Sequence, residues 1–455
     1  MVTAGTRRSS RRKALGLWMN GGFVGTWRIG SGSEDLLEYD ADWKTSPQGR
    51  PLSLSLPFTP GSTPHRGEVV RAWFDNLLPD SQEIRARAAN RFRARSTDAF
   101  DLLAQIGRDC VGALQILPDD MTPENVDTVE ATPLVEHEVA ALLRGTVAPS
   151  AFAGGTSEDD DFRVSIAGAQ EKTALTNIDG QWCRPHGSTP TTHILKLPMG
   201  LVGNMRLDLR HSIENEWLCS LILRAYGLPI AECEPLQFED MKILSVTRFD
   251  RTWLDGPRGK WLARLPQEDF CQATGTPANL KYEADGGPGI DRIMGLLATS
   301  ASPQRDRRTF FLAQLLFWML RAPDGHAKNF SLSIRPGGAY ALTPLYDVMS
   351  AWPIIGDAPD KLSDHKVRMA MAIRSANAHW KMREILPRHW LALGKRYGVL
   401  DDEGRTVQTL IDDIVERTPT VVASIEAMLP AGFPEHVADL ILRGLAREAR
   451  RLAGD

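Results

Sequence analysis

Long apolar runs are missing from this sequence. The longest one, residues 310–320, is interrupted by Gln314 and is much shorter than the ~20 apolar residues that cross a bilayer, so it predicts a buried helix. An arginine-rich N-terminus resembles the start of a secretory signal, but residues 15–27 are broken by glycines and offer no cleavage site of small residues. We therefore expect a cytoplasmic protein with no membrane partner.

The sequence also has few cysteines and a small net charge. The five cysteines are far apart and form neither a C-x-x-C pair nor a metal-ligand spacing with the histidines, which favours a reducing compartment. A net charge of −4 and a pI near 6.2 argue against a surface built as a whole to hold nucleic acid, although a local basic patch stays open. With 42% hydrophobic and 24% charged residues, the chain is expected to fold.

Length and pattern predict several subdomains, because 455 residues are too many for one compact core. Residues 1–13 predict a flexible basic tail. Residues 14–120 predict a β-rich subdomain, in which residues 52–56 alternate with strict period two, as a strand would. Residues 121–255 predict a mixed α/β lobe and residues 256–455 a mainly helical one. The predicted fold class is α+β, and this order suits a two-lobed kinase core.

Three polar residues after the apolar run have the layout of a phosphoryl-transfer site. Asp324 is followed by Asn329 and, further on, by Asp347. In kinase-type catalysis one aspartate accepts the proton of the attacking hydroxyl, while an asparagine and a second aspartate hold magnesium. The D-x-x-x-x-N spacing alone is weak, because it arises by chance about once in a chain of this length. The alternative is that Asp324 caps a turn and Asn329 satisfies backbone groups.

Two upstream segments could complete such a site. Residues 165–173 contain small side chains that would let backbone N–H groups approach a phosphate, although a surface turn is the more common outcome of this pattern. Lys196 lies between two leucines of an expected strand, where it either points to solvent or binds phosphates in a cleft. Glu214 and Glu216, on a helix expected at 212–226, are placed to pair with it as the helix glutamate does in protein kinases.

Taken together, these segments resemble the HipA family of toxin kinases, the toxin halves of bacterial HipBA toxin–antitoxin pairs. The resemblance runs in order over most of the chain, apart from the basic tail and the far C-terminus. The matching segments are residues 74–80, 100–103, 106–109, 165–175, 194–198, 248–251, 264–269, 281–283, 285–290, 324–332 and 344–347. The family implies a serine/threonine protein kinase that uses ATP and Mg²⁺, with a β-rich N-terminal subdomain and a two-lobed core.

The same resemblance implies roles for individual residues. Asp324 would be the catalytic base, Asn329 and Asp347 the magnesium ligands, and Ser165 an autophosphorylation site whose phosphate would repel ATP and switch the enzyme off. The implied ATP-binding residues are Ala167, Gly168, Ala169, Gln170, Glu171, Lys172, Lys196, Thr247, Arg248, Phe249, His326, Lys328 and Tyr346. Residues 246–249 would form the hinge beside adenine. Thr247 stands where the family often carries an acidic residue, so backbone contacts to adenine would remain there without a carboxylate contact.

The resemblance also implies a biological role. The kinase would act as a toxin that phosphorylates an aminoacyl-tRNA synthetase and so inhibits translation. Its implied partners are a small helix-turn-helix antitoxin and, mainly through that complex, operator DNA. Two other classes stay open: a small-molecule phosphotransferase of the aminoglycoside or choline kinase type, which shares the D-x-x-x-x-N spacing, and a kinase-dead transcriptional corepressor.

Overall fold

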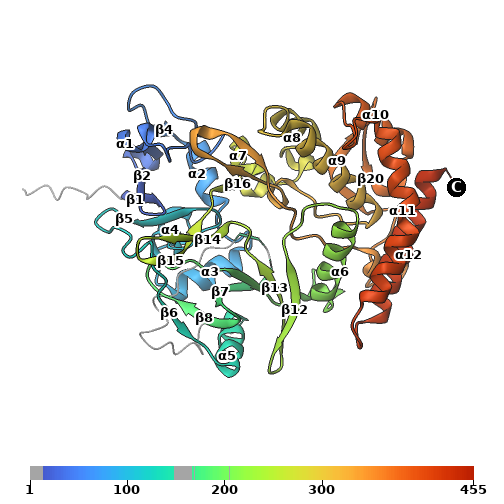
Figure 1. Ribbon diagram of the computed structural model, residues 1–455, viewed down its shortest axis with the longest axis horizontal. Helices are drawn as coiled ribbons and strands as arrows, with labels where there is room; N and C mark the ends of the chain where they lie inside the picture. Colours follow the sequence, from blue (N-terminus) through green and yellow to red (C-terminus); the bar gives the residue numbers. More distant parts are fainter. Residues whose placement is uncertain (1–13, 148–166, 169, 204, 455) are drawn as a thin grey trace, which may run out of the picture.

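The N-terminal part of the chain and its C-terminal helices lie on opposite sides of the molecule (Figure 1, blue and red). The computed structural model describes residues 14–147, 167–168, 170–203 and 205–454. The predicted tail at residues 1–13, and with it the predicted site residues Ser165 and Ala169, fall outside the described residues.

The N-terminal domain is an antiparallel sheet packed against helices. Its strands run in the order β4-β3-β2-β1-β5. Trp27 on β2 stacks on Phe74 of α2 with ring centroids 3.8 Å apart, at the centre of this domain's own core. The elements are β1 Ala14–Met19, β2 Gly22–Ile29, β3 Asp35–Tyr39, α1 Ala41–Thr45, β4 His65–Arg66, α2 Glu68–Asp75, α3 Gln82–Arg91, α4 Ala99–Ile106 and β5 Leu114–Pro118.

The strand expected at residues 52–56 is wrong. These residues form a tight turn closed by an isolated bridge. Leu52 and Leu56 are buried in the N-terminal core, whereas Leu54 packs against the core of the helical lobe. The period-two pattern therefore reflects contacts with two different hydrophobic cores and not the two faces of a sheet.

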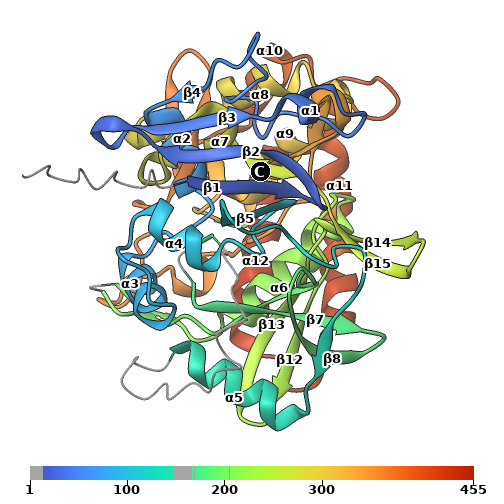
Figure 2. The same cartoon turned by 90° about the vertical axis from the view of Figure 1, so that its left-hand side faces the viewer.

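A six-stranded sheet below the N-terminal domain forms the first lobe of the core (Figure 2). Its order is β12-β13-β9-β7-β8-β6. Leu195 of β9 shares a cluster with Leu143 of α5, whereas its neighbour Ile194 belongs with Ile213 of α6, so the two helices cover opposite faces. The elements are β6 Ala131–Pro133, α5 Glu136–Val147, β7 Lys172–Ile178, β8 Gln181–Pro185, β9 His193–Lys196, β10 Gly200–Val202, β11 Leu207–Leu209, α6 Ser212–Ala225, β12 Cys233–Phe238 and β13 Met241–Thr247.

The helical lobe is organised around α9 Pro303–Met319, whose Phe310, Leu315 and Trp318 are fully buried. This confirms the buried helix expected from the apolar run. The remaining elements are β16 Gln267–Asp269, α7 Phe270–Thr274, α8 Ile290–Leu297, β17 Ser331–Ile334, β18 Tyr340–Leu342, β19 Arg368–Arg374, β20 Ala378–Lys381, α10 Pro387–Arg396, α11 Val407–Met428 and α12 Glu435–Ala453. Among the helices of the described residues, none has the length and apolar character that crossing a membrane requires.

The lobes together confirm the predicted α+β class. A hairpin of β14 Arg251–Gly256 and β15 Gly259–Arg264 projects from the molecule at the level between the N-terminal domain and the six-stranded sheet (Figure 2). This hairpin spans residue 255, where the sequence placed a domain boundary. The boundaries at residues 120 and 255 stay predictions.

Candidate active site

A cleft between the six-stranded sheet and the helical lobe gathers most of the predicted site residues. Asn76 and Asp80 of the N-terminal domain also line it. The predicted residues that line the cleft are Ala167, Gly168, Lys172, Lys196, Thr247, Arg248, Phe249, Asp324, His326, Lys328, Asn329, Tyr346 and Asp347. Five separate segments of the sequence thus contribute to one surface, as the kinase interpretation requires.

Two residues predicted to contact ATP, Gln170 and Glu171, do not line the cleft. The Gln170 amide donates to the carbonyl of Leu197 at 2.6 Å. Glu171 forms an ion pair with Arg87 of α3. Both side chains are occupied in anchoring the start of β7, so any contact of these two residues with ATP would use their backbone groups.

Strand register places two lysines side by side. Lys172 of β7 lies directly opposite Lys196 of β9 in the antiparallel pairing, and residues opposite each other project from the same face. Lys196 shares that face with Ile194, which packs toward α6. Both ammonium groups therefore lie on the side of the sheet that faces α6 and the cleft.

Lys196 is held by two carboxylates. Its Nζ donates to Oε1 of Glu216 at 2.6 Å and to Oδ1 of Asp347 at 2.8 Å. Burial alone would lower the pKa of Lys196, but Asp347 and Glu216 raise it above its usual value. The ammonium is therefore permanently charged and fixed in position.

The structure decides between the two candidate glutamates of α6. Glu216 is only 6% exposed and points to Lys196. Glu214 instead pairs with Lys242 of β13. The helix thus carries the glutamate of the kinase-type pair at Glu216.

Asp347 adopts an unusual backbone conformation. Its φ of 62° lies in the left-handed region, which is uncommon for a residue other than glycine and often marks a functional site. Burial alone would raise the pKa of the Asp347 carboxyl, but Lys196 and Lys172 hold it far below its usual value. Asp347 is therefore ionised at neutral pH, as a cation ligand must be.

Lys172 supports the loop before β7. Its Nζ donates to the carbonyl of Ala167 at 2.9 Å. Gly168 has a φ of +114°, and a Cβ placed there would lie 2.4 Å from the Lys172 Nζ, so only glycine leaves room for this contact. Burial, and then the charge of Lys196, lowers the pKa of Lys172 to about 8, while Asp347 opposes this shift.

Asp324 lies on the loop that follows α9 and is 52% exposed. Its carboxylate accepts a hydrogen bond from the Tyr282 hydroxyl, and His326 Nε2 lies 3.6 Å from Oδ1. Within the described residues no backbone N–H donates to this carboxylate, so the turn-capping alternative does not describe it.

Asn329 and His326 complete the loop. The Asn329 amide nitrogen donates to the Asp324 carbonyl at 2.7 Å, so part of the backbone-satisfying alternative holds while its amide oxygen is left for other contacts. His326 is buried, its ring meets the Tyr282 ring edge-on at 5.0 Å, and its Nδ1 has no partner in the described part of the chain. Burial lowers the pKa of His326, so the ring is neutral at pH 7.

The predicted hinge, residues 246–249, contributes less than expected. The Thr247 N–H donates to the Glu232 carbonyl and the Arg248 N–H donates to the Thr192 carbonyl, both at 2.8 Å. Backbone contacts to adenine at these two positions would have to use other groups. Phe249 does face the cleft, with its ring 5.9 Å from that of Tyr346.

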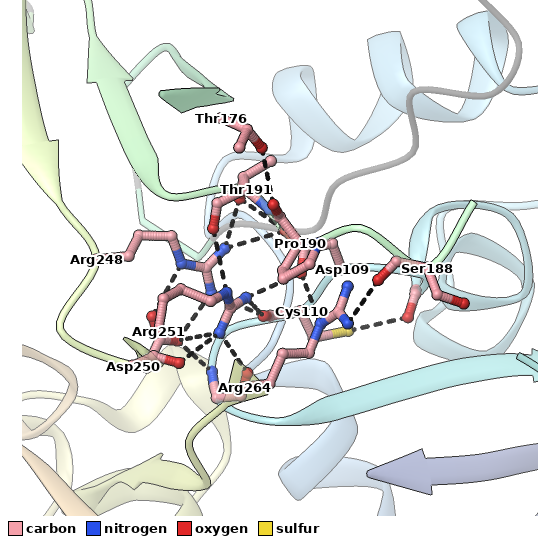
Figure 3. Close-up of polar contacts among 12 residues, drawn as sticks. Asp109, Cys110, Thr176, Ser188, Pro190, Thr191, Arg248, Asp250, Arg251 and Arg264 are labelled. Carbon is pink, nitrogen blue, oxygen red and sulfur yellow. Dashed lines mark hydrogen bonds and ion pairs between the residues drawn. The ribbon is translucent and has the colours of Figure 1, made fainter. Parts of the chain in front are cut away.

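The Arg248 side chain takes part in a buried ionic network beside the cleft (Figure 3). Arg248 and Arg251 both bond Asp250, and Asp109 of the N-terminal domain bonds Arg251 and Arg264 at 2.9 and 3.0 Å. Burial alone would raise the pKa of Asp109, but the arginines hold it far below its usual value. The network therefore ties the N-terminal domain to the hinge and to the β14–β15 hairpin.

Sequence reasoning assigned no role to three residues near Asp324 and Lys328. They are Tyr282, Lys281 and Asp80. All three lie in segments that carry the family resemblance, at residues 74–80 and 281–283. That resemblance was the only available signal, because no local pattern indicates which distant residues will meet.

Comparisons with known protein families match both parts of the chain. The HipA-like C-terminal domain matches residues 164–422, and the HipA N-terminal domain matches residues 15–117. A protein described as putative kinase Y4mE from Sinorhizobium fredii is 31% identical over 438 residues, covering 94% of this chain and 97% of that protein.

Two further comparisons involve Shewanella oneidensis. Its serine/threonine-protein kinase toxin HipA is 26% identical over 410 residues, covering 87% of this chain and 84% of the toxin. A solved structure of the HipA, HipB and operator DNA complex from that organism contains a chain that matches with a TM-score of 0.76 at 22% identity, covering 97% of both chains. At that identity the likeness shows the shared fold.

Proposed function

Because this chain belongs to the HipA family, we propose that it is an ATP- and magnesium-dependent serine/threonine protein kinase that acts as a cytoplasmic toxin. The main support for this proposal is that Lys196 contacts both Glu216 and Asp347 in the same cleft as Asp324 and Asn329. In protein kinases the lysine–glutamate pair and the metal-binding aspartate must both be in place for activity.

The residues of the cleft suit the phosphates of ATP and a metal ion. Among the described residues, the partly buried ammonium of Lys172 bonds only the Ala167 carbonyl, so an anion would relieve the cost of partly burying its charge. The amide oxygen of Asn329 and the carboxylate of Asp347 are oxygen donors of the kind that magnesium prefers. When bound, magnesium neutralises charge on the phosphates.

Asp324 would accept the proton from a serine or threonine hydroxyl of the substrate. Its half-exposed carboxylate can be reached by a protein substrate, and Tyr282 and His326 fix its orientation from the buried side. Lys196 and Lys172 would hold the phosphates. We propose an aminoacyl-tRNA synthetase as the substrate, so that the modification inhibits translation.

The proposed function is tested with labelled ATP and a bacterial lysate. Transfer to protein bands by the purified chain is the expected result, followed by identification of the modified protein by mass spectrometry. Transfer to small metabolites alone would support a phosphotransferase of the aminoglycoside or choline kinase type. No transfer at all would favour the corepressor.

ATP affinity is expected to depend on the protonation of Lys172. Burial and Lys196 lower the pKa of this lysine to about 8, and only its protonated form attracts phosphate. The KM for ATP should therefore be constant below that pH and rise as the pH increases through it. The Lys172→Arg variant should show no such rise, because arginine stays protonated. A wild-type KM that does not change with pH would contradict the assignment of Lys172.

Autophosphorylation of Ser165 is expected when the protein is incubated with ATP and magnesium. Ser165 lies two residues before Ala167 in the sequence, and a phosphate there adds close to two negative charges beside the phosphate loop. Mass spectrometry should find this phosphate as activity declines, and Ser165→Ala should stay active for longer. A substrate phosphorylated while Ser165 stays unmodified would refute this regulation.

A small helix-turn-helix antitoxin and operator DNA are the partners that we propose. The support comes from the Shewanella structure, which is a complex of HipA, HipB and operator DNA. A net charge of −4 suits a chain that reaches DNA through a partner. Co-purification of the chain with the product of a neighbouring helix-turn-helix gene tests this.

A further inference from the structure

One carboxylate of the N-terminal domain reaches into the candidate active site and bonds two lysines of the helical lobe. Asp80 Oδ1 lies 2.7 Å from Lys328 Nζ, and Asp80 Oδ2 lies 2.7 Å from Lys281 Nζ. Lys328 belongs to the loop of Asp324, and Lys281 precedes Tyr282, which bonds Asp324. We call these two ion pairs the Asp80 tether.

Asp80 also contacts the loop before β7, which is the proposed phosphate loop. The Asp80 N–H donates to the carbonyl of Gly168 at 3.1 Å, next to a backbone bridge between Pro79 and Gly168. Asp80 is thus bonded to both sides of the cleft, to the loop before β7 through its backbone and to the Asp324 loop through its side chain.

The position of Asp80 is fixed by its own domain. Arg85 Nε donates to the carbonyl of Pro79 at 2.6 Å, and Arg85 is itself held by Asp75. Ser81 caps the N-terminus of α3 by accepting from the Ile84 N–H. These contacts anchor the segment to the rest of the N-terminal domain.

Electrostatics keep the tether closed at neutral pH. Burial alone would raise the pKa of Asp80, but Lys328 and Lys281 lower it to about 2. The Lys328 side chain is only 4% exposed and that of Lys281 only 17%. Without the carboxylate, two poorly solvated ammonium groups would face each other, and their repulsion would displace the loops that carry them.

We propose that Asp80 is a positioning residue for phosphate transfer. It holds Lys328 and Lys281 in fixed positions relative to Asp324. It also connects the helical lobe to the phosphate loop, so that the N-terminal domain forms part of the active site. This inference rests on the proposed kinase activity. Asp80 acts through the two lysines, and it is not a ligand of ATP.

The test compares Asp80→Asn with a control variant, Glu38→Gln. Glu38 is also an ion-paired carboxylate of the N-terminal domain, but its partner Arg28 lies in the same domain, and neither residue lines the cleft. We expect Asp80→Asn to lower kcat by roughly 10- to 100-fold, because small displacements of catalytic groups are costly. The KM for ATP should not rise, since removing a negative charge does not weaken phosphate binding. Glu38→Gln should keep the wild-type kcat.

A double-mutant cycle shows whether Asp80 acts through Lys328. The double variant Asp80→Asn with Lys328→Met should be no slower than Lys328→Met alone, because the effects of residues that act as a unit do not add. Multiplied effects, a wild-type kcat in Asp80→Asn, or a raised KM with unchanged kcat would each overturn the proposal. If Asp80→Asn does not fold, Lys281→Met and Lys328→Met test the tether by removing its lysines. A wild-type kcat in both of these variants would overturn the proposal.

Amine labelling followed by mass spectrometry reports on the tether without any catalysis. Lys281 and Lys328 should become more reactive in Asp80→Asn and not in Glu38→Gln. A wild-type protein that transfers no phosphate would refute the kinase function. The labelling would still show whether Asp80 shields Lys281 and Lys328. Unchanged labelling in an active wild-type background would refute only the tether.

Discussion

Replacing Asp324 by asparagine is expected to lower phosphate transfer by about 10²- to 10⁴-fold, the usual contribution of a general base. Asparagine keeps the shape of the side chain and still accepts the Tyr282 hydrogen bond, but it takes up no proton. The side chain is 52% exposed, so the free energy of unfolding should change by less than ~0.5 kcal/mol. Initial rates with labelled ATP and thermal unfolding measure the two effects.

Asp285→Asn is the control for this variant. Asp285 is an exposed aspartate three residues after Tyr282 that does not line the cleft, and its loss should leave the rate unchanged. Equal rates for wild type and Asp324→Asn would refute Asp324 as the base. Expression in cells extends the test, because growth arrest that persists with Asp324→Asn would favour the corepressor over the kinase.

Replacing Lys196 by methionine is expected to abolish activity and also to destabilise the protein by about 3–5 kcal/mol, because it leaves a buried carboxylate without its cation. Glu216 is only 6% exposed, and Lys196 Nζ is its ion-pair partner in the described structure. Burial already raises the pKa of Glu216. Its protonation at low pH should therefore reduce the destabilisation as the pH falls. Chemical unfolding at several pH values gives this difference.

Two further variants separate stability from activity. Lys196→Met combined with Glu216→Gln removes the unpaired charge, so it should recover much of the stability and none of the activity. Lys381→Met breaks a surface pair with Glu384, in which the two side chains are 43% and 60% exposed, so it should cost no more than about 1 kcal/mol. Equal losses for Lys196→Met and Lys381→Met would show that the buried pair has no special role.

Local patterns predicted several elements of the site. The apolar neighbours of Lys196 indicated a strand, and the spacing of Ile213, Trp217 and Leu221 indicated the helix observed as α6. The choice between Glu214 and Glu216 depended on how α6 is rotated against the sheet. That rotation is set by packing against Ile194 and Leu244, which are distant in sequence.

Long-range contacts explain what the sequence did not predict. Arginine is a residue type usually found at the surface, yet Arg248 is buried between its near neighbour Asp250 and Asp109, which is 139 residues away in the chain. The alternation at residues 52–56 is equally ambiguous, since it arises wherever a segment lies between two cores. Family resemblance pointed to the correct segments, but the contacts of Asp80 become visible only when the segments are folded together.

The ionic network of Figure 3 has a consequence for the chain as a folding unit. Asp109 is the carboxylate that the N-terminal domain supplies to Arg248, Arg251 and Arg264. In a core made as a separate polypeptide from residue 121 onward, Arg248 and Arg251 would keep Asp250, whereas Arg264 would lose its carboxylate partner Asp109 and keep the Ser188 carbonyl. The two parts should therefore remain associated if the chain is cut between them, and the isolated core should require its N-terminal half in order to fold.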